Sequence, residues 1–355
     1  MDTPLHLDPA RLMQEIGAFQ RKLSAGMGQL RGMREPGYAN TPRELVHAED
    51  KLKLWHMQGD RAPTAGTPTL IVYALVNTVW MTDLQPDRSL VRNLLAQGED
   101  VYLIDWGYPD GADRWLTLDD YLNGYLDRCV DAVRERHGLD AINLLGICQG
   151  GAFSLCYGAM HPDKVKNLVT MVTPVDFQTP DNMLSHWCRE LDVDLFVDTL
   201  GNVPAMLMNW VYLTLKPVRL NQQKYVGLVD ILDQPVELEN FLRMERWIFD
   251  SPDQAGETFR QFVKDFYQSN KLVKGGLAIG GREVDLHKLE LPILNIYAEQ
   301  DHLVPPDASR ALGRRVGSTD YTELAFKGGH IGIYVSGRAQ REVPPAIHQW
   351  LRARD

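Results

Sequence analysis

The six residues 146–151, Gly-Ile-Cys-Gln-Gly-Gly, constrain the fold of this chain more than any other stretch. They follow an apolar run at 141–145 that predicts a buried strand, and they precede a helix-like stretch from Ala152 to Met160. Glycines around Cys148 allow a strained turn where the strand and the helix meet without side-chain clashes. Such a turn presents one reactive side chain above a sheet, so we predict that Cys148 is a nucleophile.

Strand-like and helix-like segments alternate on both sides of this turn. The predicted strands are 69–76, 101–106, 142–146, 165–172, 291–298 and 321–326. The predicted helices are 89–97, 117–137, 306–315 and 344–354. A capping pattern at Thr117 and Asp120 opens the second of these helices, and the last one begins with prolines in its first turn. This alternation predicts a mostly parallel sheet flanked by helices, and the cysteine turn makes it an α/β-hydrolase fold.

The chain is predicted to have three parts. Residues 1–48 contain an amphipathic helix at 8–33, which packs on the core or meets a partner, and then a loop at 34–48. Residues 49–174 and 291–355 form the α/β-hydrolase core. Residues 175–290 are mainly helical and rich in Leu, Met, Phe and Trp, which predicts a cap inserted over the site. Their apolar residues either line an acyl channel or form a helical core of their own.

The composition excludes several classes of protein. A net charge of −10 with scattered basic residues argues against a nucleic-acid partner. No secretory signal is visible, and polar residues interrupt the longest apolar stretch, 195–218, so no membrane span is predicted. The four cysteines have neither metal-binding nor disulfide spacing, which fits a reducing, cytoplasmic location.

A cysteine nucleophile needs a base, and the base needs an orienting acid. Asp301 follows the predicted strand 291–298, and His330 follows the last strand within Lys-Gly-Gly-His-Ile-Gly at 327–332. The order nucleophile, acid, histidine is that of the α/β-hydrolase triad, so we predict a triad of Cys148, Asp301 and His330. The backbone N–H groups of Gln149, at the start of the helix, and Asn77, after strand 69–76, are the candidates for the oxyanion hole.

Other sites are less well supported by the residues. His302 is either an auxiliary base or a structural hydrogen-bonding residue, and the second interpretation is favoured. No metal site is predicted, because adjacent residues such as Asp301 and His302 point in different directions and the zinc-binding patterns are absent. No nucleotide or other cofactor site is predicted, because the glycine-rich stretches break the dinucleotide-binding pattern and lack the lysine of a phosphate-binding loop.

The chain closely resembles the catalytic subunit of polyhydroxyalkanoate synthases, in particular the short class III type that has two kinds of subunit. The resemblance spans nearly the whole chain. Beside the cysteine turn it includes Tyr-Ala-Leu-Val-Asn at 73–77, Asp-Leu-Gln-Pro-Asp-Arg-Ser at 83–89, Asp-Trp-Gly at 105–107, Thr-Pro-Val-Asp-Phe at 173–177, Asp-His-Leu-Val-Pro-Pro at 301–306 and Gly-Gly-His-Ile-Gly at 328–332. Class IV enzymes are also short and have a different small partner.

The resemblance implies the polymerisation of (R)-3-hydroxyacyl-CoA, typically 3-hydroxybutyryl-CoA, into polyester with release of CoA. It implies that Cys148 carries the acyl chain as a thioester, that His330 is the general base and that Asp301 is the triad acid. Whether Asp301 also helps to activate the attacking 3-hydroxyl group stays open. It also implies a second, non-catalytic (PhaE-type) subunit, self-association as a homodimer, and attachment to polyester granules in the cytoplasm. Acyl-CoA is then a substrate, and no cofactor is expected.

Two other interpretations stay open at the level of the sequence. The first is a cysteine-dependent hydrolase, either a thioesterase or a dienelactone-type hydrolase, with the same order of Cys, Asp and His. The second is a granule-associated scaffold protein on a degenerate hydrolase fold. The length of the 175–290 insertion argues against the first, and the intact triad residues argue against the second.

Overall fold

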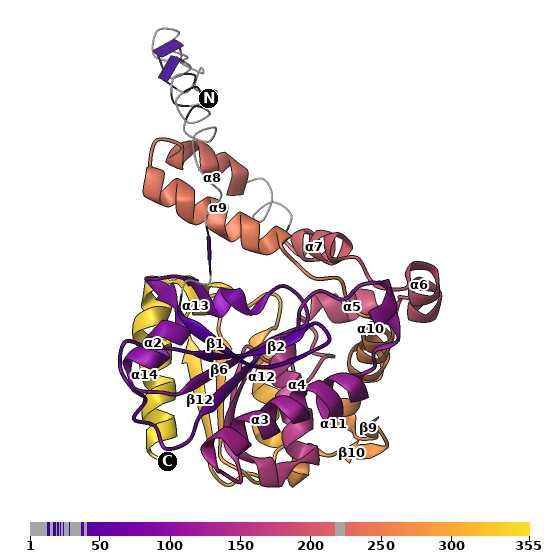
Figure 1. Ribbon diagram of the computed structural model, residues 1–355. Helices are drawn as coiled ribbons and strands as arrows, with labels where there is room; N and C mark the ends of the chain where they lie inside the picture. The colour runs from indigo at the N-terminus through magenta and orange to yellow at the C-terminus, as the bar shows by residue number, and fades with distance from the viewer. Residues whose placement is uncertain are drawn as a thin grey trace, which may run out of the picture.

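An eight-stranded sheet forms the centre of the molecule (Figure 1). The computed structural model describes residues 41–216 and 224–355, with a few separate positions between 13 and 38. The strands lie in the order β1 (Arg43–Glu49), β2 (Leu52–Met57), β6 (Val101–Asp105), β3 (Thr69–Val72), β7 (Ile142–Ile147), β8 (Val165–Met171), β11 (Ile293–Ala298) and β12 (Tyr321–Phe326). From β6 to β12 every neighbouring pair is parallel, whereas β1 and β2 join antiparallel at one edge.

Helices cover both faces of this sheet. One face packs against a π-helical turn, η3 (Asp120–Leu126), that continues into α3 (Asp127–His137), and against α4 (Gln149–Met160). The other face packs against α2 (Leu90–Ala96), α13 (Gly332–Val335) and α14 (Gly337–Arg352). The short α12 (Pro306–Arg310) and η8 (Ala311–Arg314) connect β11 to β12. The predicted fold class, a mostly parallel sheet flanked by helices, is confirmed.

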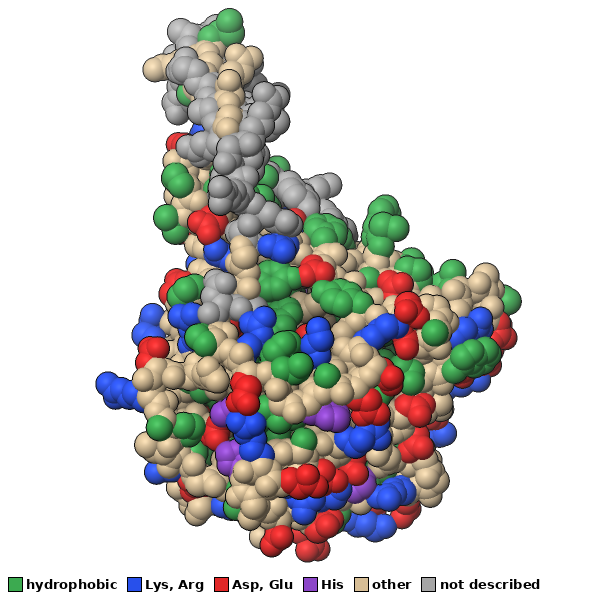
Figure 2. All heavy atoms as spheres, in the orientation of Figure 1, with side chains coloured by type: hydrophobic (Ala, Val, Ile, Leu, Met, Phe, Trp, Pro, Cys, Tyr) green, Lys and Arg blue, Asp and Glu red, His purple; other side chains and the backbone are tan. Residues whose placement is uncertain are grey.

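The insertion between β8 and β11 divides into two regions. Its first region contains α5 (Met183–Arg189), α6 (Val193–Leu200), α7 (Ala205–Thr214), α8 (Lys224–Ile231) and α9 (Pro235–Phe249). The α8–α9 pair projects away from the sheet (Figure 1), and hydrophobic side chains lie on the surface of this region (Figure 2). The second region returns to the core and contains α10 (Gly256–Phe262), η6 (Val263–Gln268), α11 (Lys271–Lys274), β9 (Leu277–Ile279), β10 (Arg282–Val284) and η7 (Leu286–Lys288). Phe262, Phe266 and Leu272 join the main hydrophobic cluster, so this second region is part of the core.

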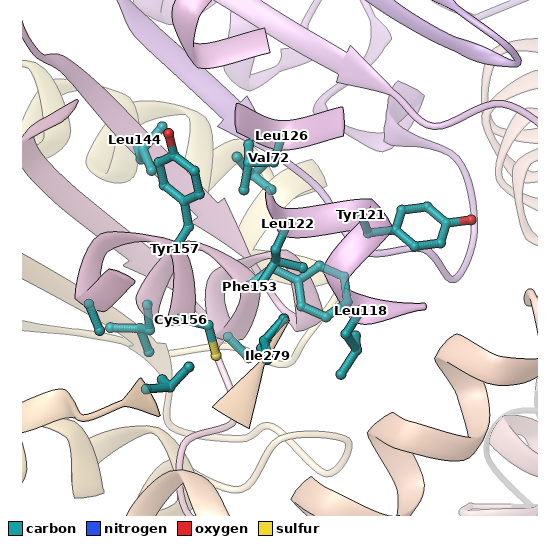
Figure 3. Close-up of a cluster of buried hydrophobic side chains, with 14 of the residues drawn as sticks. Val72, Leu118, Tyr121, Leu122, Leu126, Leu144, Phe153, Cys156, Tyr157 and Ile279 are labelled. Atoms are coloured by element: carbon teal, nitrogen blue, oxygen red, sulfur yellow. The ribbon is translucent and has the colours of Figure 1, made fainter. Parts of the chain in front are cut away.

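The helix that follows the cysteine turn is buried on nearly every side. All residues of α4 from Gln149 to Ala159 are buried, because the β9–β10 hairpin and the η3–α3 helix cover the side that the sheet leaves open. Figure 3 shows Phe153, Cys156 and Tyr157 of this helix packed with Leu122 and Ile279. Because α4 is enclosed in this way, the turn at Cys148, directly before its first residue, is held in one position.

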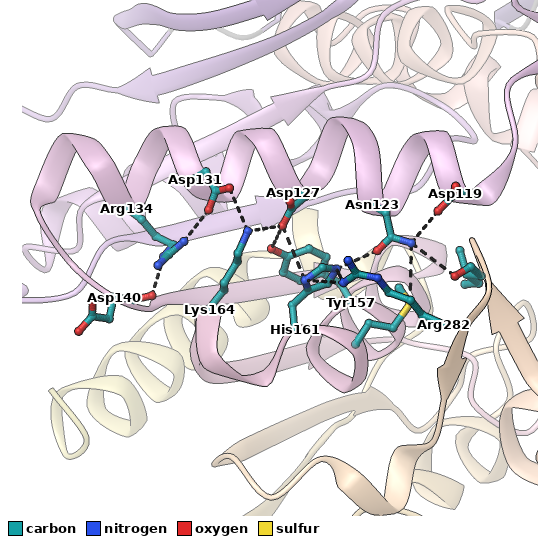
Figure 4. A network of polar contacts seen from close by, with 12 residues as sticks. Asp119, Asn123, Asp127, Asp131, Arg134, Asp140, Tyr157, His161, Lys164 and Arg282 are labelled. Carbon is teal, nitrogen blue, oxygen red and sulfur yellow. Dashed lines mark hydrogen bonds and ion pairs between the residues drawn. The ribbon is translucent and has the colours of Figure 1, made fainter.

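A polar network on the edge of this cluster joins α3, α4 and the β9–β10 hairpin (Figure 4). The Asp127 carboxylate accepts hydrogen bonds of 2.7 Å from the Tyr157 hydroxyl and from Lys164 Nζ. Asn123 contacts His161 at 2.8 Å, and Arg282 of β10 contacts the same imidazole at 3.3 Å. These contacts satisfy polar groups where α3, α4 and the β9–β10 hairpin meet.

The structure corrects two details of the sequence prediction. The predicted loop at 34–48 is wrong over its last residues, because Arg43–Glu49 is the edge strand β1. An edge strand with few buried side chains lacks the apolar run by which a central strand is detected. The last helix begins at Gly337 rather than Pro344, with Ser336 as its N-cap and with Pro344 and Pro345 in its interior. The predicted helix at 8–33 lies mostly outside the described residues.

Candidate active site

Cys148 lies at the junction between β7 and α4, in the strained conformation that its glycine neighbours predict. Its backbone has φ 54° and ψ −124°, a region that residues with a Cβ atom rarely adopt. Its N–H group donates to the Met171 carbonyl of β8 at 2.9 Å, which fixes the turn to the sheet. A Cβ atom at Gly150 would clash with the backbone of Val72, and one at Gly151 would clash with Thr173. The glycines therefore allow α4 to approach the end of β3.

Asp301 and His330 meet beside this turn, as predicted. The Asp301 Oδ2 atom lies 2.7 Å from His330 Nδ1, and both side chains are buried. The second carboxylate oxygen of Asp301 accepts hydrogen bonds from the N–H groups of Leu303 and Val304, at 2.8 and 2.9 Å. Three hydrogen bonds thus hold the carboxylate, and the bond to Nδ1 leaves Nε2 of His330 to act on Cys148.

The imidazole of His330 is held in its protonated form. Burial alone lowers the pKa of His330, but the negative charges of Asp301 and Cys148, together with hydrogen bonds to both groups, raise it to about 10. A protonated imidazole beside the sulfur stabilises the thiolate, which is the reactive form of a cysteine. The structure therefore brings Cys148, His330 and Asp301 together in a cysteine–histidine–aspartate arrangement.

The two candidate oxyanion donors belong to segments that contact each other. Gln149 is the first residue of α4, so its N–H group is among those that helix geometry leaves without an intrahelical acceptor. The side-chain oxygen of Gln149 accepts a hydrogen bond of 3.0 Å from the N–H of Leu75, in the loop that follows β3. Asn77, two residues further on, has φ 62°. This loop is thus tied to the helix that carries the nucleophile.

His302 lies directly after Asp301 in the turn before α12 and is half-buried. The described part of the chain contains no group of three or more His, Cys, Asp or Glu side chains arranged to bind a metal ion. Within the same residues, no helix is both long enough and apolar enough to cross a bilayer.

Tyr334, a buried tyrosine in contact with His330, was not predicted from the sequence. Tyr334 lies in α13, shortly after His330, and the two rings are in edge contact with their centroids 6.3 Å apart. Its side chain is only 1% exposed, and its hydroxyl has no hydrogen-bond partner among the described residues. Burial, followed by the charges of Tyr73, Cys148 and Asp301, raises the pKa of Tyr334 well above its usual value. Nothing in the local sequence pattern singles out Tyr334, because His330 lies in the turn before α13 and not in the helix.

Residues of the insertion also reach the neighbourhood of Cys148. Burial raises the pKa of Tyr212 in α7 and of Tyr267 in η6, and the negative charges of Cys148 and Cys188 contribute in both cases. The sequence alone could not have selected these tyrosines, because nothing in their local pattern relates them to residue 148.

Comparison with known proteins agrees with this geometry. Residues 67–336 match the model of the α/β-hydrolase fold family. Solved structures with this fold superpose on the chain, among them a bromoperoxidase from Bacillus anthracis, 15% identical, covering 88% of this chain and 100% of that one with a TM-score of 0.52. A carboxylesterase structure from the thaumarchaeon Nitrososphaera gargenis is also 15% identical, covers 88% of this chain and 98% of that one, and has a TM-score of 0.51. The chain is thus a member of the α/β-hydrolase fold family.

More specific relatives match from end to end. The poly(3-hydroxyalkanoate) polymerase subunit PhaC of Allochromatium vinosum is 62% identical over 99% of this chain and 99% of its own. The corresponding subunit of Thiocystis violacea is 60% identical with the same coverage, and that of Synechocystis is 54% identical over 96% of this chain and 93% of its own. Within the α/β-hydrolases, the chain therefore belongs to the family of PhaC polymerase subunits.

Proposed function

We propose that this chain is the catalytic subunit of a poly(3-hydroxyalkanoate) polymerase, an acyltransferase that links (R)-3-hydroxyacyl groups from CoA thioesters into polyester. The observation that carries the proposal is a cysteine, in place of the usual serine, in the strained turn of an α/β-hydrolase fold beside the Asp301–His330 pair. Its likeness to PhaC subunits over the whole chain supports this function rather than that of a thioesterase or a dienelactone-type hydrolase. The preferred monomer is 3-hydroxybutyryl-CoA.

The first step loads the enzyme. The Cys148 thiolate attacks the thioester carbonyl carbon, and the backbone N–H groups of Gln149 and Asn77 stabilise the negative charge that develops on the carbonyl oxygen. The C–S bond to CoA then breaks, and the protonated His330 gives its proton to the departing CoA thiolate. One thioester replaces another, so this step is nearly balanced in free energy.

The second step elongates the chain. The 3-hydroxyl of an incoming acyl group attacks the thioester on Cys148, and the now neutral His330 accepts the hydroxyl proton. An oxoester forms and the sulfur of Cys148 leaves as a thiolate, which makes this step favourable. Asp301 orients His330 and favours its protonated form. It does not contact the substrate, because its side chain is fully buried and both of its oxygens already accept hydrogen bonds.

Water must be kept from the acyl-enzyme, because its attack would release a free hydroxy acid. The buried position of His330 and Asp301, and the tyrosines that the insertion contributes, support a water-poor site. We assign no catalytic role to His302. The reaction uses no cofactor or metal, because the cysteine and the histidine supply the nucleophile and the base.

The partners follow from the same proposal. We expect a second, PhaE-type subunit, self-association as a homodimer, and attachment to the growing polyester granule in the cytoplasm. Exposed apolar side chains on the insertion support a contact surface there.

The test measures CoA release from (R)-3-hydroxybutyryl-CoA by the purified protein and quantifies the insoluble product in the same tube. We expect CoA release to be matched by pelletable polyester and to be lost in Cys148→Ala. Release matched by free 3-hydroxybutyrate would make the protein a thioesterase instead. An unchanged polymer yield in cells that carry Cys148→Ala would show that the chain is a scaffold.

A further inference from the structure

The loop that follows β3 is held by the base of the helical insertion. We call residues 75–78 the oxyanion loop, since they include Asn77, and we call residues 247–254, from the end of α9 to the start of α10, the insertion base. The indole N–H of Trp247 donates to the Thr78 carbonyl at 2.9 Å, and the side-chain amide of Gln254 donates to the Leu75 carbonyl at 2.7 Å. The side-chain amide of Asn77 donates to Ser251 Oγ at 2.9 Å.

The contacts of Trp247 and Gln254 are buried, which increases their effect on the position of the loop. Trp247 is 3% exposed and Gln254 is 4% exposed, so each would leave a polar group without a partner in a dry environment if its bond broke. The backbone of Gln254 is itself fixed, because it exchanges two hydrogen bonds of 2.9 Å with Val203, ahead of α7. The insertion base is therefore a rigid support rather than a loose strand of chain.

The other side of the oxyanion loop is tied to the nucleophile. Gln149 accepts the N–H of Leu75, so the loop spans from the first residue of α4 to the insertion base. None of the bonds that hold the loop uses the N–H of Asn77, which remains for the substrate oxygen. The insertion base thus donates hydrogen bonds to the carbonyl groups of Leu75 and Thr78 and accepts one from the Asn77 side chain. On the other side, α4 accepts one hydrogen bond, from the N–H of Leu75.

We propose that Trp247, Ser251 and Gln254 are positioning residues, and that the oxyanion hole is complete only while the insertion is seated on the core. This proposal rests on the function proposed above and deepens it. Loss of the hydrogen bonds that Trp247, Ser251 and Gln254 make with the oxyanion loop would release this loop on the side of the insertion, so we expect the thioester to be activated only while these bonds are made.

The test compares two reactions of Cys148 in variants of the insertion base. Trp247→Phe and Gln254→Leu each remove one donor while keeping most of the buried volume. Acylation by (R)-3-hydroxybutyryl-CoA needs the oxyanion hole and is followed as single-turnover CoA release at saturating substrate. Alkylation by iodoacetamide needs only the thiolate. Thr258→Val is the matched control, because Thr258 in α10 is itself only 2% exposed and donates a hydrogen bond of 2.6 Å to the Leu116 carbonyl, away from the oxyanion loop.

We expect each variant of the insertion base to lower the acylation rate about tenfold and the double variant about 100-fold, the scale of a misplaced oxyanion donor. Alkylation rates should stay within about twofold of the wild type, because the nucleophile and His330 are unchanged. Thr258→Val should leave both rates near those of the wild type.

Two results would overturn the proposal. The first is acylation in Trp247→Phe and Gln254→Leu as fast as in Thr258→Val. The second is a parallel fall of acylation and alkylation, which would indicate general damage to the fold. If the wild type, assayed together with its second subunit, is alkylated normally but releases no CoA, the proposed function fails and this inference falls with it.

Discussion

At the scale of single residues, two negatively charged neighbours, Asp301 and Cys148, raise the pKa of His330. Asp301 contacts Nδ1 at 2.7 Å, and Cys148 supplies the second charge and hydrogen bond. These interactions outweigh the burial of the imidazole, so the pKa of His330 rises to about 10. A histidine that stays protonated near neutral pH favours the thiolate form of a neighbouring cysteine, which is the form that attacks a thioester.

This pKa predicts how stability depends on pH. The value for an unfolded histidine is about 6.5, below that of the folded chain, so the folded state binds more protons between the two values. The stabilisation from His330 is complete below about pH 6.5 and is lost as the pH rises through about 10, with a slope of at most about 1.4 kcal/mol per pH unit. The free-energy difference between the wild type and His330→Gln, measured by urea unfolding, should therefore shrink as the pH increases. A difference that grows with pH would contradict the assignment.

At the scale of elements, the contact between β3 and α4 decides where the nucleophile stands. The three glycines at 146, 150 and 151 let the helix start against the backbone of Val72 and the side chain of Thr173. The sheet, the β9–β10 hairpin and α3 then enclose α4. Because every side of this helix is occupied, a methyl group at its start cannot be accommodated by moving the helix.

Substitution of Gly150 by alanine is the corresponding prediction. The added methyl group would clash with the Val72 carbonyl, so we expect a loss of about 1–3 kcal/mol in the free energy of unfolding. A shift of the turn should also slow the alkylation of Cys148. Gly158→Ala, in the same helix, is the control: its methyl group would lie 3.1 Å from a flexible Leu289 methyl, and the helix gains up to about 1 kcal/mol of propensity. Equal stability of the two variants in urea unfolding would refute the packing argument.

At the scale of the whole molecule, the insertion presents an apolar surface on the side away from the sheet. Exposed large hydrophobic side chains gather on its first region, namely Met183, Trp187, Leu195, Leu200, Met206, Leu207, Trp210, Val226, Val236 and Phe249. A surface of this kind is typical of a contact with a partner, a second copy or a hydrophobic phase. The insertion thus contacts residues 75–78 on one side and exposes large apolar side chains elsewhere on its surface.

We predict that self-association depends on this surface. Met206 and Trp210 of α7 are 70% and 66% exposed, so the double variant Met206→Ser, Trp210→Ser removes much of the local apolar area without disturbing the core. Sedimentation velocity over a range of concentrations should show weaker dimerisation than in the wild type, with the rate of Cys148 alkylation unchanged. Trp115→Ser, at a similarly exposed position outside the insertion, should dimerise as the wild type does. Identical dimerisation of all three proteins would place the interface elsewhere.

Much of the fold and the site follows from local pattern alone. Buried parallel strands require continuous apolar runs, so the central strands could be predicted from the sequence. The strained turn requires glycines, which predicted its position at Cys148, and the order of residues typical of the fold predicted that Asp301 and His330 meet. The strands and the turn depend on residues close together in the chain, and a sequence records such neighbours directly, whereas Asp301 and His330 were selected by the order that is typical of the fold.

The tertiary structure alone decided the features that depend on distant contacts. The edge strand Arg43–Glu49 is held by pairing with β2 rather than by apolar residues of its own, so the sequence showed no strand there. Tyr334 and Tyr212 come to the site, and Trp247 and Gln254 come to the oxyanion loop, only because the insertion and α13 fold back over the sheet. Local propensity and periodicity carry no information about which of many buried side chains meet across such distances, because packing of the whole chain selects those pairs.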